Sequence, residues 1–342
     1  MTQQVGMTQQ VGMTQQVGMT QPLRIAVCTP RRPTPADEAW GLVVTPWLPE
    51  AVLDGTVLAE AWHRGPTLEA DRILVPFTFG TASASPFATP EGMRRFLALL
   101  PYFGPAPERH LLLDNTDLDT PSDDLRGAVL FKTSASFRHP QILPLPYSLP
   151  DPGPPHPVTG AQLDLAFQGS LDTHPIRDWM ERWRHSWRLA VEIRSTPRPF
   201  WLLERSEQAS FARSYVEQLR RTRFVLCPRG RALNSRRFYE ALAHGRIPVL
   251  ITDAARLPLA SRIDYARFVV TVPEGFGRWT PDYVADFLAH HDLAEACRLA
   301  RVTWQEWFAP ERFHRFVQAS LADAGLAGLP TAASRARAHG AP

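Results

Sequence analysis

Four arginines and one glutamate are concentrated in the stretch CPRGRALNSRRFYEALAHGRIPVLITD, residues 227–253. These residues are Arg229, Arg231, Arg236, Arg237 and Glu240. The planar guanidinium of arginine can hold two phosphate or carboxylate oxygens at once, and a carboxylate can accept hydrogen bonds from both hydroxyls of a ribose diol. The pattern therefore suggests a site for a nucleoside diphosphate. It is also compatible with an ordinary helix salt bridge, because Arg236 and Arg237 precede Glu240 by four and three residues.

The elements around this stretch form a strand, a loop and a helix. The strand is expected over 224–227, and the loop that follows carries Gly230. Asn234 or Ser235 could cap the start of the helix with its side chain, and Gly245 stands where a left-handed residue would end it. Free amides and the helix dipole attract anions at such a start. We therefore expect the arginines to surround an anion site at the carboxyl end of a strand.

Two common nucleotide-binding motifs are absent from the sequence. No G-x-G-x-x-G follows a strand, as it would in a nicotinamide or flavin site, and no G-x-x-x-x-G-K-[ST] indicates a phosphate loop with magnesium. A nucleotide would have to be held here without either device.

Short apolar runs alternate with helical patterns along the chain. The runs expected to form strands are 23–28, 72–77, 110–114, 128–131, 141–145, 163–169, 188–193, 223–227, 247–251 and 267–272. Helices are expected over 92–100, 175–186, 208–222, 235–245, 281–290, 293–308 and 311–322. Near-continuous apolar runs are typical of parallel strands that are covered on both faces.

A proline-rich segment, PLPYSLPDPGPPHP (144–157), divides this alternation in two. Its prolines favour a stiff, extended linker, which indicates a domain boundary. We therefore expect an α/β protein with two Rossmann-like, doubly wound domains, 21–150 and 151–324, that face a cleft. Ligands of such sheets bind at the carboxyl ends of the strands.

The two ends of the chain are expected to lack stable structure. MTQQVG occurs three times within residues 1–20, and its polar units offer too little apolar surface to offset the ordering entropy. Residues 325–342 are rich in alanine, glycine and arginine and should form a flexible tail. The true start codon stays open among Met1, Met7, Met13 and Met19.

Composition argues against several classes of protein. The formal net charge is only +3, and Lys132 is the sole lysine, so the chain lacks the dense basic face of a nucleic-acid-binding protein. LRRTRF (219–224) and RSTPRPFW (194–201) are too short to reverse that view. Three widely spaced cysteines indicate neither a disulfide framework nor a zinc site. Without a long apolar run, we expect no membrane span and a cytoplasmic location, with peripheral membrane association as an option.

At residues 223–253 the sequence resembles the exostosin-type glycosyltransferases, glycosyltransferase family 47. In that family an apolar strand, P-R-G, a serine, R-x-x-E-A and G-x-I-P-V follow in this order, as they do in RFVLCPRGRALNSRRFYEALAHGRIPVLITD. LPLASRIDYARFVVTVPE (257–274) is similar to the family's L-P-F segment, and LAFQGSLDTHPIRDWM (165–180) to its F-x-G loop. The resemblance spans about 165–320 and is loose before it, where only FRHPQILPLPY (137–147) matches.

The resemblance implies a GT-B fold that binds a nucleotide sugar, commonly UDP-linked, and inverts the anomeric carbon. Arg229 and Arg237 would face the diphosphate, and Glu240 the ribose. The other positions implied on the donor side are Gly169, Arg177, Gly230, Asn234 and Ser235. Arg246 departs from the family's usual cysteine or alanine at that position, and the membrane anchor of animal members is not found in this sequence.

Direct inversion needs a general base on the acceptor side. His139, Asp114 and Asp119 are the candidates in the first half of the chain, where the resemblance is loosest. Asp117 and Asp119 allow a different interpretation, because single-domain GT-A transferases hold a metal-bound nucleotide sugar with such a pair, and Mg²⁺ or Mn²⁺ prefers oxygen ligands. An acidic, solvated loop is the simpler alternative, and we expect no metal cofactor.

The tryptophans at 179, 183 and 187 lie on one helical face and favour a core-facing stripe over a sugar-stacking platform. The sequence as a whole predicts a bacterial glycosyltransferase that moves a sugar from a UDP-sugar to a glycan or glycolipid acceptor of a surface polysaccharide. The alternative is a non-catalytic sugar- or nucleotide-binding scaffold of the same fold. Neither the sugar, the linkage nor the oligomeric state can be inferred.

Overall fold

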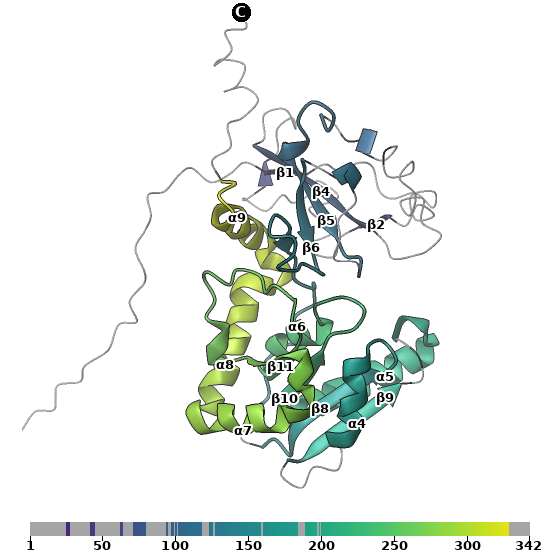
Figure 1. Cartoon of the computed structure of the whole chain (residues 1–342), viewed down its shortest axis with the longest axis vertical. Coiled ribbons are helices and arrows are strands. Elements are labelled where there is room, and N and C mark those ends of the chain that lie inside the picture. The colour runs from purple at the N-terminus through teal and green to yellow at the C-terminus, as the bar shows by residue number, and fades with distance from the viewer. Residues whose placement is uncertain are drawn as a thin grey trace, which may run out of the picture.

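The computed structural model describes residues 102–117, 127–158, 160–183, 189–196 and 200–327, together with shorter segments at 25–27, 42–44, 62–63, 71–79 and 123–125 and isolated positions near 94–100 and at 198. Two sheets lie one above the other (Figure 1), and each is accompanied by helices. The first sheet is built from the chain before the proline-rich segment and the second from the chain after it.

The first sheet has the strand order β3-β1-β4-β5-β6-β7, with β2 paired antiparallel to β4 and the other pairs parallel. Its strands are β1 (Ile25–Val27), β2 (Leu42–Val44), β3 (Trp62–His63), β4 (Arg72–Phe79), β5 (His110–Asp114), β6 (Val129–Lys132) and β7 (Leu143–Pro144). The short helical turns η2 (Pro107–Arg109) and η3 (Asp123–Leu125) precede β5 and β6. Every residue of β5 and β6 is buried, as expected for strands that are covered on both faces.

The second sheet is parallel throughout, in the order β12-β11-β10-β8-β9. Its strands are β8 (Leu163–Ser170), β9 (Val191–Thr196), β10 (Thr222–Pro228), β11 (Ile247–Ile251) and β12 (Val270–Val272). Its longer helices are α4 (Asp178–Trp183), α5 (Arg205–Arg221), α6 (Arg236–Ala243), α7 (Thr280–His290), α8 (Leu293–Thr303) and α9 (Phe313–Asp323). Shorter turns are η4 (Pro175–Arg177), η5 (Phe200–Leu202), η6 (Tyr265–Arg267), η7 (Glu274–Trp279), the π-helical η8 (Trp304–Phe308) and η9 (Pro310–Arg312).

The two sheets are joined by direct contacts and by one shared hydrophobic core. Ser136 and Ala255 form an antiparallel bridge between the loops at their facing ends. The last helix, α9, crosses back to the first sheet, where Phe316 packs against Phe131 with ring centroids 6.1 Å apart. Buried side chains of both sheets therefore belong to a single contiguous cluster. We expect the two halves to move little relative to each other.

The proline-rich segment is anchored to the second half rather than suspended between the halves. Arg301 donates hydrogen bonds to Asp151 and to the carbonyl of Gly153, and the buried Arg246 donates to the carbonyls of His156, Leu219 and Arg220. This gives the unusual Arg246 a structural purpose, because its guanidinium ties the linker to the end of α5.

The structure confirms the predicted α/β class with parallel sheets and most of the predicted elements. Gly245 does end α6 in the left-handed region, with φ at 62°. Within the predicted helix 92–100, Arg94, Leu97 and Ala98 are helical, and most of its other positions fall outside the described residues. Trp187 and much of the two predicted tails also fall outside them. Trp183 is buried, as the core-facing stripe requires. The GT-B arrangement and the domain boundaries stay predictions.

The expected side-chain cap of α6 is wrong. Ser235 occupies the capping position but its hydroxyl makes no capping hydrogen bond, and Asn234 instead accepts from the Ser235 amide and donates to the Tyr239 hydroxyl. Asn234 is therefore turned toward the core, and no side chain of the cap residue competes for an anion at this helix start.

None of the helices in the described part of the chain has the length and the hydropathy needed to cross a bilayer.

Candidate functional site

The predicted donor residues gather where β8 and β10 end and α6 begins (Figure 1). The two strands are direct neighbours in the sheet, so the loops that follow them lie side by side. Gly169 is the last residue but one of β8, Arg177 ends η4, Arg229 and Gly230 follow β10, and Arg237 is the second residue of α6. A single βαβ unit thus supplies most of the charge, and the neighbouring strand supplies the rest.

Arg237 is the most enclosed of these arginines. Its guanidinium carbon lies 5.2 Å from the centroid of the Phe167 ring and 4.6 Å from that of Tyr215. A methyl group at Gly169 would come within 2.6 Å of Arg237 Nη2, so glycine is required there for the arginine to reach its place. Cation–π contacts of this kind hold a guanidinium without using its hydrogen bonds. Its Nη1 donates to Glu240.

Glu240 is paired with two arginines of its own helix. Its carboxylate lies 3.0 Å from Arg236 Nε through one oxygen and 3.0 Å from Arg237 Nη1 through the other. The helix salt bridge considered above is therefore present. The Arg236 side chain is 60% exposed, so its share of the pairing is weak and a ribose could displace it, whereas Arg237 and Glu240 are each only 17% exposed.

Arg177 joins the two loops. It donates hydrogen bonds to the carbonyls of Ser170, Pro228 and Arg229, which end β8 and β10. Burial, reinforced by the nearby charge of Arg237, lowers its pKa to about 10. A methyl group at Gly230 would approach Arg177 Nη2 to 3.1 Å. Arg177 thus holds the loops in place, with three of its donors already committed to protein carbonyls.

Arg229 faces a carboxylate that the sequence did not single out. Its Nη1 lies 3.4 Å from Glu274 Oε1, at the end of β12, and the Glu274 amide donates to Asp253 after β11. His174 lies in the same region, with its Nδ1 accepting from the Ile176 amide. Burial first, and then the charge of Arg229, lowers the pKa of His174, so the ring is neutral at pH 7. The neutral ring carries its proton on Nε2.

Three acidic residues were considered on the acceptor side. Asp114 is buried at the end of β5 and forms a 2.5 Å ion pair with Lys132, the sole lysine. Lys132 also donates to Thr116 Oγ1. Asp117 is half-buried one turn further along, and Asp119 lies outside the described residues. The candidate base Asp114 is therefore already neutralised by a buried partner.

No group of three or more metal-ligating side chains occurs among the residues that the structure describes. Because Asp119 is outside those residues, the pairing of Asp117 with Asp119 stays untested.

Comparison with known proteins identifies the domain. The sequence profile of the exostosin GT47 domain matches residues 130–276. The chain contains an exostosin GT47 domain. The matched range includes every donor-side residue named above and begins at β6 of the first sheet. The resemblance predicted from the motif at 223–253 is therefore confirmed.

Curated relatives of the exostosin domain come from animals and plants. Exostosin-1 of Drosophila melanogaster is 37% identical over 94 residues, which is 28% of this chain and 12% of that protein. The probable glucuronoxylan glucuronosyltransferase IRX7 of Arabidopsis thaliana is 30% identical over 181 residues, or 48% of this chain and 38% of that protein. The chain thus spans well under half the length of these relatives. The predicted bacterial origin gains no support from them.

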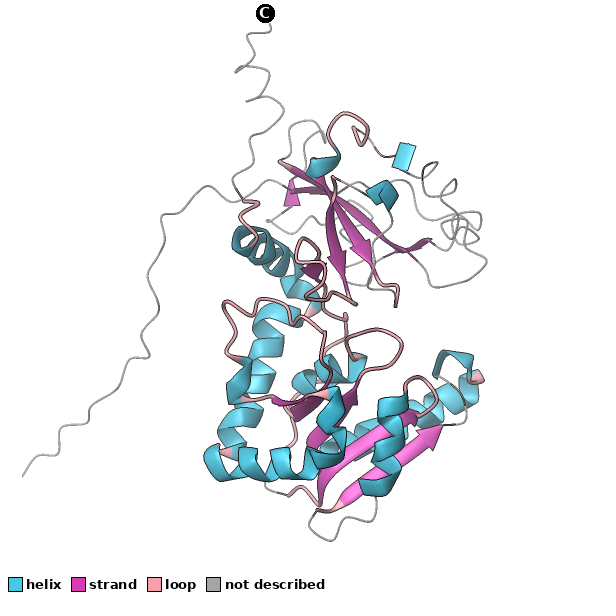
Figure 2. Cartoon of the chain, viewed as in Figure 1, coloured by secondary structure: helices cyan, strands magenta, loops and turns pink. Residues whose placement is uncertain are grey.

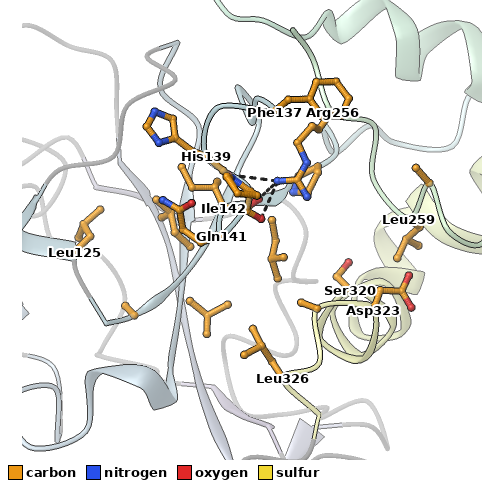
Figure 3. Close-up of a pocket in the computed structure, with 18 of the residues that line it drawn as sticks. Leu125, Phe137, His139, Gln141, Ile142, Arg256, Leu259, Ser320, Asp323 and Leu326 are labelled. Carbon is orange, nitrogen blue, oxygen red and sulfur yellow. Dashed lines mark hydrogen bonds between the residues drawn. The ribbon is translucent and has the colours of Figure 1, made fainter.

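A cavity between the first sheet and the end of α9 is lined by residues other than the predicted donor arginines (Figure 3). It measures about 1070 Å³ and is bordered by β6, β7, the loop at 256–261 and the end of α9. His139, a predicted candidate base, lines this cavity, and none of the predicted donor residues does. Arg256 closes one side by donating to the carbonyls of His139, Pro140 and Ile142. The structure therefore separates His139 from the donor residues of the exostosin domain.

Sequence reasoning missed His174, Glu274, Phe167 and Tyr215 of the exostosin domain. His174 stands within the quoted F-x-G loop, three residues before Arg177, so its position in the motif was a usable signal. Phe167 is the phenylalanine of that F-x-G motif and Glu274 the last residue of the quoted segment 257–274, so both also had a local signal. Tyr215 is brought in by α5, and no quoted motif marks it.

Proposed function

We propose that the protein is a glycosyltransferase that uses a nucleotide sugar, most simply a UDP-sugar, as its donor. The observation that carries the proposal is the enclosed pair of Arg237 and Glu240 at the start of α6, in the position of the family motif. The guanidinium suits the diphosphate and the carboxylate suits the ribose diol. The names of the relatives, exostosin and glucuronosyltransferase, support the same class of reaction.

Bond breaking at the sugar places growing negative charge on the diphosphate. Arg229, Arg237 and the free amides at the start of α6 would stabilise that charge without a metal ion. Loss of one such donor typically costs about 3–4 kcal/mol of transition-state stabilisation. Attack from the face opposite the diphosphate would invert the anomeric centre, and the acceptor is proposed to be a glycan or glycolipid.

Thermal unfolding with UDP, GDP, TDP and ADP tests the donor site. A nucleotide at 100 times its dissociation constant adds about 2.7 kcal/mol of stability, which shifts the melting temperature by several degrees. We expect a shift with UDP that EDTA leaves unchanged and that Arg237→Lys and Glu240→Gln each abolish. Arg298→Ala, on the exposed face of α8, should keep it.

If none of the four nucleotides raises the melting temperature, the proposal is contradicted. A shift with UDP, combined with no release of UDP from any UDP-sugar, would favour the non-catalytic binding protein instead. Because the names of two plant relatives specify glucuronosyl transfer, UDP-glucuronic acid belongs in the donor panel.

A further inference from the structure

Asp117 stands where the first sheet meets the start of α6. The carboxyl ends of β5 and β6 point toward the second sheet (Figure 2), and Asp117 follows β5. Ser134, in the loop after β6, donates its hydroxyl proton to the carbonyl of Asp117 at 2.9 Å. The same hydroxyl oxygen accepts a hydrogen bond of 3.0 Å from the amide of Leu233, which lies three residues before α6. Two hydrogen bonds thus connect Asp117 to the loop that leads into the donor site.

The carboxylate of Asp117 is held differently from that of its neighbour Asp114. Asp114 is almost fully buried, is paired with Lys132 and accepts from the Thr116 amide. Asp117 is half-buried, and within the described part of the chain its carboxylate has no hydrogen bond and no ion pair. It is thus a partly desolvated carboxylate with both oxygens available.

The charged and titratable groups around Asp117 come from several elements. Arg231 approaches from the loop before α6, and Lys132 from β6. Tyr147, near both Asp117 and Arg236, has a pKa raised to about 12 by burial, so it stays neutral across the working range of pH. Because Arg231 belongs to the loop before α6, these groups place Asp117 beside the arginine loop of the proposed donor site.

We infer that Asp117 is the general base that deprotonates the acceptor hydroxyl. The inference rests on the proposed function and assigns a residue of the first sheet to it. In the step, the acceptor O–H proton passes to an Asp117 oxygen while the acceptor oxygen forms a bond to the anomeric carbon. The bond between that carbon and the diphosphate oxygen breaks, and its electron pair stays on the diphosphate, where Arg229 and Arg237 balance the charge.

The environment of Asp117 suits this role better than that of the other candidates. Burial raises its pKa above the usual range, against the opposing effect of Arg231 and Lys132, and a raised pKa makes a carboxylate a stronger base. Asp114 is committed to Lys132, and His139 lines the cavity on the α9 side.

The first experiment measures UDP release from four donors, with water as the acceptor. The donors are UDP-glucuronic acid, UDP-N-acetylglucosamine, UDP-galactose and UDP-xylose. We expect Asp117→Asn to lower the rate by about 10²–10⁴-fold, the usual contribution of a general base, with the UDP-induced thermal shift unchanged. Asp264→Asn, at an exposed turn, is the matched control and should keep the wild-type rate.

Azide makes the test more specific. It is an anion that can replace the acceptor hydroxyl as the nucleophile, and it has no proton for a general base to remove. Sodium azide should restore UDP release to Asp117→Ala but not to Arg237→Lys, whose defect is in the leaving group. A merely structural role for Asp117 would not predict the rescue of Asp117→Ala by azide.

Three outcomes would overturn the inference. Asp117→Asn with a rate within about threefold of wild type would do so while leaving the transferase intact, because a general base is worth far more. A rise in melting temperature with UDP, combined with no release of UDP from any donor in water or azide, would overturn it and favour a binding protein. If UDP does not change the melting temperature of the wild type, the proposed donor site itself is overturned.

Discussion

The proposed donor side, within the exostosin match at 130–276, and the proposed acceptor side, after β5, hold their charges in opposite ways. On the donor side, Arg177 and Arg237 are fixed by carbonyls and aromatic rings before any ligand binds. On the acceptor side, one carboxylate is locked in a buried pair and the next has no partner within the described residues. Preorganised positive charge costs no reorganisation when the diphosphate develops its charge. An acceptor base must instead stay free to take a proton.

The largest effect is expected from the buried pair on the acceptor side. Lys132→Met would leave Asp114 charged, buried and unpaired, which typically costs about 3–5 kcal/mol of unfolding free energy. Replacing both residues by apolar ones of similar size should recover most of the loss. Urea unfolding of the two variants measures this. Equal destabilisation in the single and double variants would mean that the pair is not the source of the effect.

The next effect concerns the donor side, and a loss of stability should accompany it because Gly169 has φ at 159°, where a side chain is strained. In Gly169→Ala the new methyl group would meet Arg237 Nη2, the movable end of a side chain, rather than the backbone. We therefore expect UDP affinity to fall by about tenfold or more, roughly 1.4 kcal/mol. Calorimetric titration measures the affinity. Gly275→Ala, where a methyl group meets nothing within 4 Å, should bind UDP normally; a matching loss there would contradict the explanation.

A smaller effect should appear in acid. Burial lowers the pKa of His244, at the end of α6, from 6.5 to about 4. Between these values the unfolded chain binds a proton that the folded chain does not, so stability is full above about pH 6.5 and falls toward pH 4. His244→Gln should flatten this slope in unfolding measured at several pH values. The exposed His290→Gln should keep it. A slope unchanged in His244→Gln would place the acid sensitivity elsewhere.

The smallest effect is expected for Arg236→Ala. Its salt bridge with Glu240 is exposed on the arginine side and should contribute about 0–1 kcal/mol. Thermal unfolding should therefore change little, and UDP should bind as well or slightly better, because Glu240 loses a competitor. A loss of UDP binding as large as in Gly169→Ala would instead make Arg236 a direct donor ligand.

The sequence could predict which charged residues gather at the start of α6 because they are close along the chain. Arg229, Arg237 and Glu240 fall within one βαβ unit, and Gly245 ends α6 as its position indicated. The roles that were missed depend on long-range packing. Arg177 reaches carbonyls more than fifty residues away, and Glu274 meets Arg229 across forty-five. The sequence alone does not show which aspartate pairs with Lys132. The structure shows that Lys132 forms its ion pair with Asp114 and not with Asp117.

The contacts of Arg256 have a consequence for anyone who wishes to recombine such enzymes. Its guanidinium donates to three carbonyls of the 139–142 loop, those of His139, Pro140 and Ile142, although Arg256 itself belongs to the second half of the chain. The exostosin profile likewise starts at residue 130 and not at the proline-rich segment. A chimaera joined at the proline-rich segment would lose the hydrogen bonds between Arg256 and the 139–142 loop. A transplantable donor module must therefore include the loop after β6.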